Sequence, residues 1–243
     1  MTLAFDASHQ GESGGEPRFL EDPGTRVEDF RCAVDYLVTL DSVDEDRIGL
    51  VGICGGGGHA VNATMTDHRI KVLGTVVAAD YGRLMREGAP GAALEAIGKQ
   101  RTAEARGAEP VLTTYIPNTV EEREQAGITD VDIVDAVESY RTSRAQDDGA
   151  PNKLLFSGLA TAFAFDAFHL AEHLLTQPLQ IIVGDVPGGF GSYRDGFELF
   201  YRARSEKKDI FVVQGASHHD LYDKPDATAK ALEKLESFFE ENL

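Results

Sequence analysis

The chain has 243 residues, 42% of them hydrophobic and 26% charged, which are ordinary proportions for a globular protein with one medium-sized domain. Lys and Arg number 23 against 41 Asp and Glu, and the formal net charge of −18 argues against nucleic acid and membrane surfaces as partners. No apolar run is long enough to span a membrane, and two cysteines, Cys32 and Cys54, do not suit a disulfide framework. We therefore expect a cytoplasmic protein.

Strand-type and helix-type segments alternate along most of the chain, a pattern typical of a parallel sheet flanked by helices. The expected strands, in chain order, are 2–5, 47–53, 72–78, 179–184 and 210–214. The expected helices are 26–40, 59–65, 159–175, 193–204 and 227–241. The sequence therefore predicts an α/β fold.

The alternation stops between residues 80 and 151, where helix-type segments near 91–106, 120–125 and 131–146 carry few strongly apolar runs. We interpret 80–151 as a helical cap or lid. It would be inserted into a core formed by 1–79 and 152–243.

The most informative stretch is 48–58, an apolar run that ends in Cys54 and four glycines. Cys54 lies between Gly52 and Gly56 in a Gly-x-Cys-x-Gly arrangement, and a helix-type segment follows. A strand, a tight turn and a helix in this order present a nucleophile in Gly-x-Ser-x-Gly enzymes. The glycines would allow strand and helix to approach closely, and the helix N-terminus would favour the thiolate.

Two other interpretations of this stretch stay open. A cysteine after a buried strand is often only a small core residue. A glycine-rich junction between strand and helix can also bind phosphate, with Asp80 at the end of a later strand as its acidic partner. Cys54, however, stands where the nucleotide-binding pattern requires its second glycine.

Asp185 and His218 follow two later strands and, with Cys54, give the order nucleophile, acid, base. His218 would accept the thiol proton, and a carboxylate would orient its ring. The backbone N–H of Gly55 would be one oxyanion donor. His219 is the rival base, and either histidine could simply be a solvated loop residue.

Three parts of the chain together resemble bacterial α/β-hydrolases, and most closely the dienelactone-hydrolase-like and peptidase-S15-like groups. They are Phe-Asp-Ala-Ser at 5–8 with Gly-Glu-Ser-Gly-Gly at 11–15, Gly-Ile-Cys at 52–54, and Gly-Ala-Ser-His-His-Asp-Leu-Tyr at 215–222. The resemblance covers nearly the whole chain. It implies hydrolysis of an ester, thioester or lactone through an acyl-enzyme, without a metal or organic cofactor. A cysteine in place of serine is similar to dienelactone hydrolase itself.

The resemblance puts the family's acid at the position of Gly188 in this chain. Asp185 is the nearest carboxylate, and Asp80 is the alternative, because some hydrolases of this fold take their acid after the earlier strand. A dyad of Cys54 and His218 is the third possibility, because a thiol needs less help from a carboxylate.

The resemblance also aligns 2–6 with the family's fourth strand, so that three earlier strands and the loop with the second oxyanion donor have no counterpart. Either 2–5 pairs with 47–53, or the first strand is displaced, which would favour a homodimer paired across the open edge. Met1 could equally be an internal residue of a longer protein.

Three functional classes follow from these patterns, and the last of them is the phosphate- or nucleotide-binding interpretation of the Cys54 turn given above. The first is a cysteine-dependent hydrolase of a small-molecule ester, thioester or lactone. The second is a catalytically impaired relative that serves as a binding or assembly module, because losing one oxyanion donor costs roughly 100- to 1000-fold in turnover.

Overall fold

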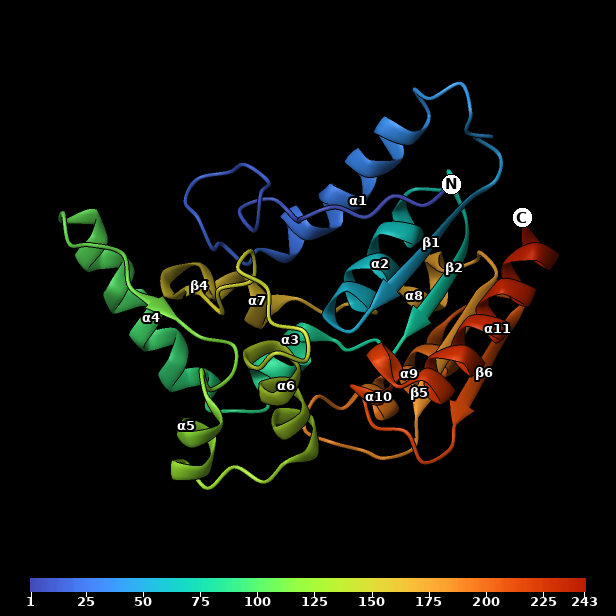
Figure 1. Ribbon diagram of the computed structural model, residues 1–243. Helices are drawn as coiled ribbons and strands as arrows, with labels where there is room; N and C mark the ends of the chain where they lie inside the picture. Colours follow the sequence, from blue (N-terminus) through green and yellow to red (C-terminus); the bar gives the residue numbers. More distant parts are fainter. The chain divides into compact units, whose positions relative to one another are not determined.

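The structure, a computed structural model, describes residues 1–243 and divides into two compact units (Figure 1). The first unit contains Met1–Leu3, Val27–Tyr81 and Asp166–Leu243. The second contains Ala4–Arg26 and Gly82–Phe165. No helix of the chain is both long enough and apolar enough to cross a membrane.

A four-stranded parallel sheet forms the centre of the first unit and confirms the predicted α/β fold. Its strands lie in the order β1 (Ile48–Ile53), β2 (Ile70–Val76), β5 (Leu179–Gly184) and β6 (Lys208–Val213). Each strand overlaps one of the expected strands, and β5 has the predicted bounds. Because all four strands are parallel, their carboxyl ends lie at one edge of the sheet.

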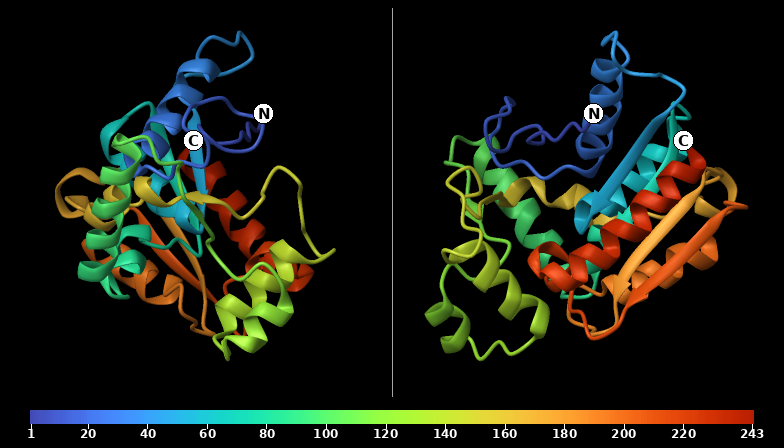
Figure 2. Two further views of the ribbon diagram at one scale, coloured as in Figure 1. Left: turned by 90° about the vertical axis from the view of Figure 1, so that its left-hand side faces the viewer. Right: turned by 45° about the vertical axis from the view of Figure 1, so that its right-hand side comes forward.

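Helices cover both faces of this sheet (Figure 2). On one face lie α2 (Gly55–Thr66) and α9 (Ser192–Arg202), and on the other lies α11 (Pro225–Asn242). The alternation along β5 decides the faces: Ile181 and Val183 point to α9, whereas Ile182 belongs to the same cluster as Leu235 of α11. All six residues of β5 are buried, as expected for a strand covered on both sides.

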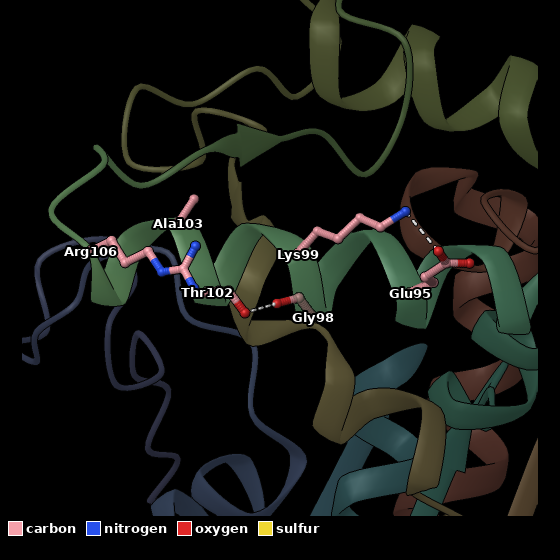
Figure 3. Close-up of a pocket in the computed structure, with 6 residues that line it drawn as sticks. All are labelled: Glu95, Gly98, Lys99, Thr102, Ala103 and Arg106. Carbon is pink, nitrogen blue, oxygen red and sulfur yellow. Dashed lines mark hydrogen bonds and ion pairs between the residues drawn. The ribbon is translucent and has the colours of Figure 1, made fainter.

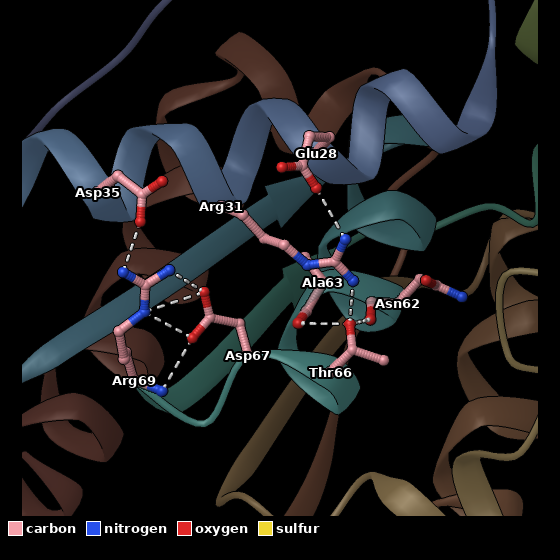
Figure 4. Close-up of polar contacts among 8 residues, drawn as sticks. All are labelled: Glu28, Arg31, Asp35, Asn62, Ala63, Thr66, Asp67 and Arg69. Atoms are coloured by element: carbon pink, nitrogen blue, oxygen red, sulfur yellow. Dashed lines mark hydrogen bonds and ion pairs between the residues drawn. The ribbon is translucent and has the colours of Figure 1, made fainter.

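Helix α1 (Pro23–Leu37) is joined to the start of the sheet by polar contacts at the surface (Figure 4). Arg31 donates to the hydroxyl of Thr66 at the end of α2, over 2.5 Å. Arg69 bridges Asp35 of α1 and Asp67, with N–O distances of 2.6 and 2.5 Å. Arg69 is partly exposed whereas Asp67 is buried, and the pair of Arg69 with the exposed Asp35 is of a kind that contributes little stability.

The prediction of one helix over 159–175 is wrong, because the chain forms two short helices there instead. These are α7 (Ala160–Ala164) and α8 (Ala171–Leu174). Between them the carboxylate of Asp166 accepts a hydrogen bond from the backbone of Phe168 at 2.9 Å, and Leu170 has a φ of 66°. A side chain that bonds its own backbone competes with the helix, and a left-handed residue interrupts it.

The strand expected over 2–5 is also wrong, since no residue before β1 is in a strand. An extended segment becomes a strand only where a partner supplies backbone hydrogen bonds. Strand β1 is therefore an edge of the sheet, and its Val51 and Ile53 side chains are 43% and 50% exposed.

The second unit is mainly helical and has its own small core of Ile97, Leu154, Leu159 and Phe163. A two-stranded antiparallel sheet, absent from the expected elements, joins residues 112–113 to 154–155. Its elements are α3 (Tyr81–Arg86, its first residue in the first unit), α4 (Pro90–Ala105), β3 (Leu112–Thr113), α5 (Val120–Gln125), α6 (Val131–Arg141), β4 (Leu154–Leu155), the 3-10 helix η1 (Phe156–Gly158) and α7.

Candidate active site

Cys54 lies in a strained turn between β1 and α2. Its φ of 54° and ψ of −131° are a conformation that side-chain-bearing residues rarely adopt. The backbone is fixed on both sides: the N–H of Cys54 donates to the carbonyl of Val76 at 3.1 Å, and its carbonyl accepts from Ala79 at 3.0 Å and Gly57 at 2.9 Å. The turn therefore holds Cys54 at the carboxyl edge of the sheet, directly before the helix.

Glycines make this turn possible. Of the two that flank Cys54 in the sequence pattern, Gly52 and Gly56, only Gly52 is needed for the close approach of strand and helix. A side-chain carbon on Gly52 would lie 2.6 Å from the Cβ of Ala60 and 2.7 Å from the Cα of Gly57. The same carbon on Gly57 would lie 2.6 Å from the Cβ of Ala78. Gly52 is thus required, as predicted, whereas the steric role expected of Gly56 is wrong, because nothing lies within 4 Å of its missing side chain.

Gly55, the predicted oxyanion donor, is the first residue of α2. The first N–H groups of a helix have no acceptor inside the helix and point outward from its positive end. Gly55 also follows the nucleophile candidate directly. This position meets the requirement for one oxyanion donor.

The loop that carries His218 folds back over the end of β5. A side-chain carbon on Gly184 would lie 2.1 Å from the carbonyl oxygen of Ala216, and the N–H of Val186 donates to that carbonyl at 3.0 Å. Ala216 and Leu221 pack in one cluster with Val76, whose carbonyl binds the backbone of Cys54. The His218 loop and the Cys54 turn therefore share the end of β2 as a common neighbour.

His218 is almost completely buried, with 2% of its surface exposed, so it is not a solvated loop residue. Its Nδ1 lies 3.1 Å from the hydroxyl of Ser192, the first residue of α9, and its Nε2 lies 3.1 Å from the hydroxyl of Tyr222. The Phe190 ring packs edge-on against it, with the ring centroids 5.2 Å apart. Burial, and to a smaller extent the neighbouring His219, lower the pKa of His218 from 6.5 to about 3.

The rival base, His219, is fully buried, and its ring centroid lies 4.9 Å from that of Tyr222. This residue belongs to the same ring cluster as His218. The structure thus places both histidine rings side by side on the loop that follows β6, with their centroids 5.0 Å apart.

Asp185 is exposed and lies beside the His218 loop, but it does not bond the imidazole. Its carboxylate accepts a hydrogen bond from the backbone N–H of Gly215 at 2.5 Å. The ring nitrogens of His218 have Ser192 and Tyr222 as their partners instead. Asp185 therefore contacts the loop that carries the base rather than the base itself.

Asp80, the alternative acid, is buried, with 5% of its surface exposed. Its carboxylate accepts from the N–H of Ala167 at 3.3 Å, and its backbone N–H donates to the carboxylate of Asp195 at 2.8 Å. These bonds join the end of β2 to α9 and to the 166–168 segment. The roles predicted for Asp80, in a nucleotide site or as the acid that orients the base, stay predictions.

The sequence did not point to Ser192 and Tyr222 as the partners of the His218 ring. Tyr222 belongs to the quoted 215–222 pattern but suggested no role there. Ser192 had no signal of its own, because its contact with His218 exists only after the β6 loop has folded over β5.

A surface pocket lies along α4 in the second unit (Figure 3). Its polar residues bond within the helix: Lys99 pairs with Glu95 at 2.6 Å, and Thr102 donates to the carbonyl of Gly98 at 2.9 Å. The lining contains no cysteine or histidine. It consists of Glu95, Gly98, Lys99, Thr102, Ala103 and Arg106. This pocket offers neither a thiol nor an imidazole, and the candidate chemistry stays with Cys54 and His218.

Known proteins resemble this chain over nearly its whole length. The uncharacterized protein YcjY of Escherichia coli (strain K12) is 39% identical over 251 residues, which take in 100% of this chain and 79% of that protein. The crystal structure of the hypothetical protein PA2218 from Pseudomonas aeruginosa matches with a TM-score of 0.87 and 30% identity, over 98% of this chain and 74% of that chain. In sequence, this chain spans 65% of the length of PA2218.

A third similar protein is the thiohydrolase apmlB of Arthrinium phaeospermum, which is 31% identical over 145 residues, or 56% of this chain and 47% of that protein. A sequence model described as the alpha/beta hydrolase family matches residues 2–231. Because this match takes in both the Cys54 turn and the His218 loop, the chain belongs to the alpha/beta hydrolase family.

Proposed function

We propose that the protein hydrolyses a small-molecule carboxylic ester, thioester or lactone through an acyl group carried on Cys54. The observation that carries this proposal is the strained turn at Cys54, which presents a thiol at the start of a 12-residue helix and at the carboxyl edge of a parallel sheet. Membership of the alpha/beta hydrolase family supports it. The name of the similar protein apmlB, a thiohydrolase, keeps thioesters among the candidate substrates.

The proposed mechanism assigns one role to each residue. His218 accepts the thiol proton, and the sulfur of Cys54 attacks the acyl carbon. The N–H of Gly55 stabilises the oxyanion of the tetrahedral intermediate. After the leaving group departs, water attacks the acyl carbon and releases the carboxylic acid. The bond from Asp185 to Gly215 supports a role in holding the His218 loop, and the bonds of Asp80 support a role in packing.

An acyl ester of p-nitrophenol tests the nucleophile directly. We expect a burst of nitrophenol that is absent from Cys54→Ala and retained in the matched control Cys32→Ala. A burst that survives in Cys54→Ala would show that another residue carries the acyl group. Absence of any turnover by the native protein would contradict the proposed hydrolysis through Cys54.

A catalytically impaired binding or assembly module is the second candidate. The favouring observation is that both ring nitrogens of His218 contact hydroxyls and neither contacts a carboxylate. A homodimer is proposed on a separate feature, the edge strand β1 with its exposed Val51 and Ile53. Light scattering on the purified protein tests it: twice the mass of the chain supports pairing, and the mass of one chain excludes it.

A further inference from the structure

The hydrogen-bond partners of the His218 ring differ from those expected of a general base in one respect: they carry no charge. Ser192, 7% exposed, contacts one ring nitrogen, and Tyr222 contacts the other, each at 3.1 Å. Asp185, the predicted acid, bonds Gly215 instead, and the carboxylate of Asp220, two residues from His218, bonds the backbone of Ser217 and pairs with Lys224. Each hydrogen-bond partner of the imidazole ring is therefore a neutral hydroxyl.

A neutral hydroxyl can hold an imidazole in place, but it stabilises the protonated ring far less than a carboxylate does. Burial adds to this effect, because it disfavours the charged form. The lowered pKa of His218, about 3, agrees with both contacts. His218 can therefore pass a proton on, but it cannot hold one in readiness for a leaving group.

This limits the substrates that the site can cleave. An alcohol leaves an ester as an alkoxide, a strong base that needs a proton as it departs. General acid catalysis of such a step contributes roughly 100- to 10,000-fold. A thiol, with an ordinary pKa of about 8.5, leaves as a stable thiolate without that help.

From the two hydroxyl contacts of His218 we infer that the substrate is an acyl thioester rather than an oxygen ester or a lactone. The inference rests on the proposed function of Cys54. Ser192 is then a positioning residue that holds the ring through Nδ1. Tyr222 releases Nε2 when Cys54 gives up its proton.

The reaction needs only water as a co-reactant. The Cys54 thiol proton passes to Nε2 of His218, a bond forms between the sulfur of Cys54 and the acyl carbon, and the carbon–sulfur bond of the substrate breaks. The electron pair leaves on the substrate sulfur as a thiolate, His218 gives its proton to water, and the thiolate takes up a proton from solvent after it has left. Water then adds to the acyl carbon, the bond to Cys54 breaks, and one carboxylic acid, one thiol and the free enzyme result.

Two substrates that differ in one atom test the inference on the native protein: the hexanoyl thioester of N-acetylcysteamine and its oxygen isostere. We expect kcat/KM for the thioester to exceed that for the ester by about 100-fold or more, the contribution of the missing general acid. Comparable values for both would overturn the inference and leave the proposed function standing. Turnover of neither substrate, with no acyl group on Cys54, would instead overturn the proposed function.

Ser192→Asp, with Ser192→Ala as its matched control, tests the role of the contact with Nδ1. The added carboxylate should raise the pKa of His218, measured by NMR titration, and raise turnover of the oxygen ester relative to the thioester. Ser192→Ala should lower turnover of the thioester without lowering the ratio of thioester turnover to oxygen-ester turnover. If Ser192→Asp raises the pKa of His218 but leaves the ratio of thioester turnover to oxygen-ester turnover unchanged, the inference is contradicted.

A series of aryl esters on the native protein needs no variant. Its rate should fall steeply as the pKa of the leaving phenol rises. A flat dependence would show that His218 protonates the leaving group, and would overturn the inference.

Discussion

The buried imidazole of His218 makes the stability of the protein depend on pH. In the unfolded chain a histidine binds a proton below its ordinary pKa of 6.5, whereas in the folded protein His218 binds one only below about 3. The unfolded state therefore holds more protons throughout this window, and acid favours it. The stability contributed by the neutral ring is fully present above pH 6.5 and is lost as the pH falls toward 3.

The size of the effect follows from the two pKa values. At about 1.4 kcal/mol for each pH unit between them, the whole window corresponds to about 5 kcal/mol of unfolding free energy. Between pH 7 and pH 4.5, the expected loss is about 2 to 3 kcal/mol. Carboxylates such as Asp67, whose pKa is lowered by its hydrogen bond to Arg69, lose their contribution only below their ordinary pKa of 3.8. The range above pH 4.5 therefore reports mainly on histidine.

Urea denaturation at pH 7 and pH 4.5, followed by circular dichroism, measures this loss. The native protein and the control His68→Gln, which replaces an exposed histidine, should both lose the full amount. His218→Gln should start from a lower stability at pH 7 and lose about 2 to 3 kcal/mol less on acidification. Equal losses in all three proteins would refute the view that His218 is kept neutral by burial.

Three further predictions concern the turn, the base loop and the thiol. Gly52→Ala should cost roughly 1 to 3 kcal/mol of unfolding free energy by overpacking, whereas Gly56→Ala should be neutral or stabilise by up to about 1 kcal/mol; equal midpoints in urea would contradict the described packing. Gly184→Ala should displace the His218 loop and lower kcat about 100-fold, and unchanged kinetics would show that the loop does not depend on this contact. Iodoacetamide should modify Cys54 at least about tenfold faster than the exposed Cys32 at pH 7, as followed by peptide mass spectrometry; faster labelling of Cys32 would argue against an activated thiol.

The sheet could be predicted because its signals are local. The apolar run of β5 is bounded by turn residues, and the predicted and observed bounds agree at Leu179–Gly184. The Cys54 turn was equally visible, because an apolar run, a cysteine and four glycines follow one another in the sequence. Each of these elements is determined by residues within a few positions of each other.

The elements that could not be predicted depend on distant parts of the chain. Residues 2–5 have a strand-like composition, but a strand also requires a partner strand, and neither sheet contains one for this segment. Residues 159–175 have a helical pattern of apolar side chains, yet the backbone at Ala167 bonds to Asp80, 87 positions earlier in the chain. Local propensity cannot anticipate either outcome.

The candidate site divides in the same way. The chain order of Cys54, Asp185 and His218 could be read from the sequence, because each follows a predicted strand. The partners of the imidazole could not, since Ser192 and Tyr222 reach it only through the fold of the β6 loop over Gly184. The consequence is chemical: a carboxylate was expected beside the base, and two hydroxyls are there instead.

The central claim is that Cys54 carries the acyl group during turnover. Mixing the protein with the hexanoyl thioester of N-acetylcysteamine, quenching in acid and mapping peptides by mass spectrometry tests this claim most directly. We predict one hexanoyl group on the peptide that contains Cys54, and none on the peptide that contains Cys32. Consumption of the thioester with no acyl group on Cys54, or with the acyl group on another residue, would contradict the account.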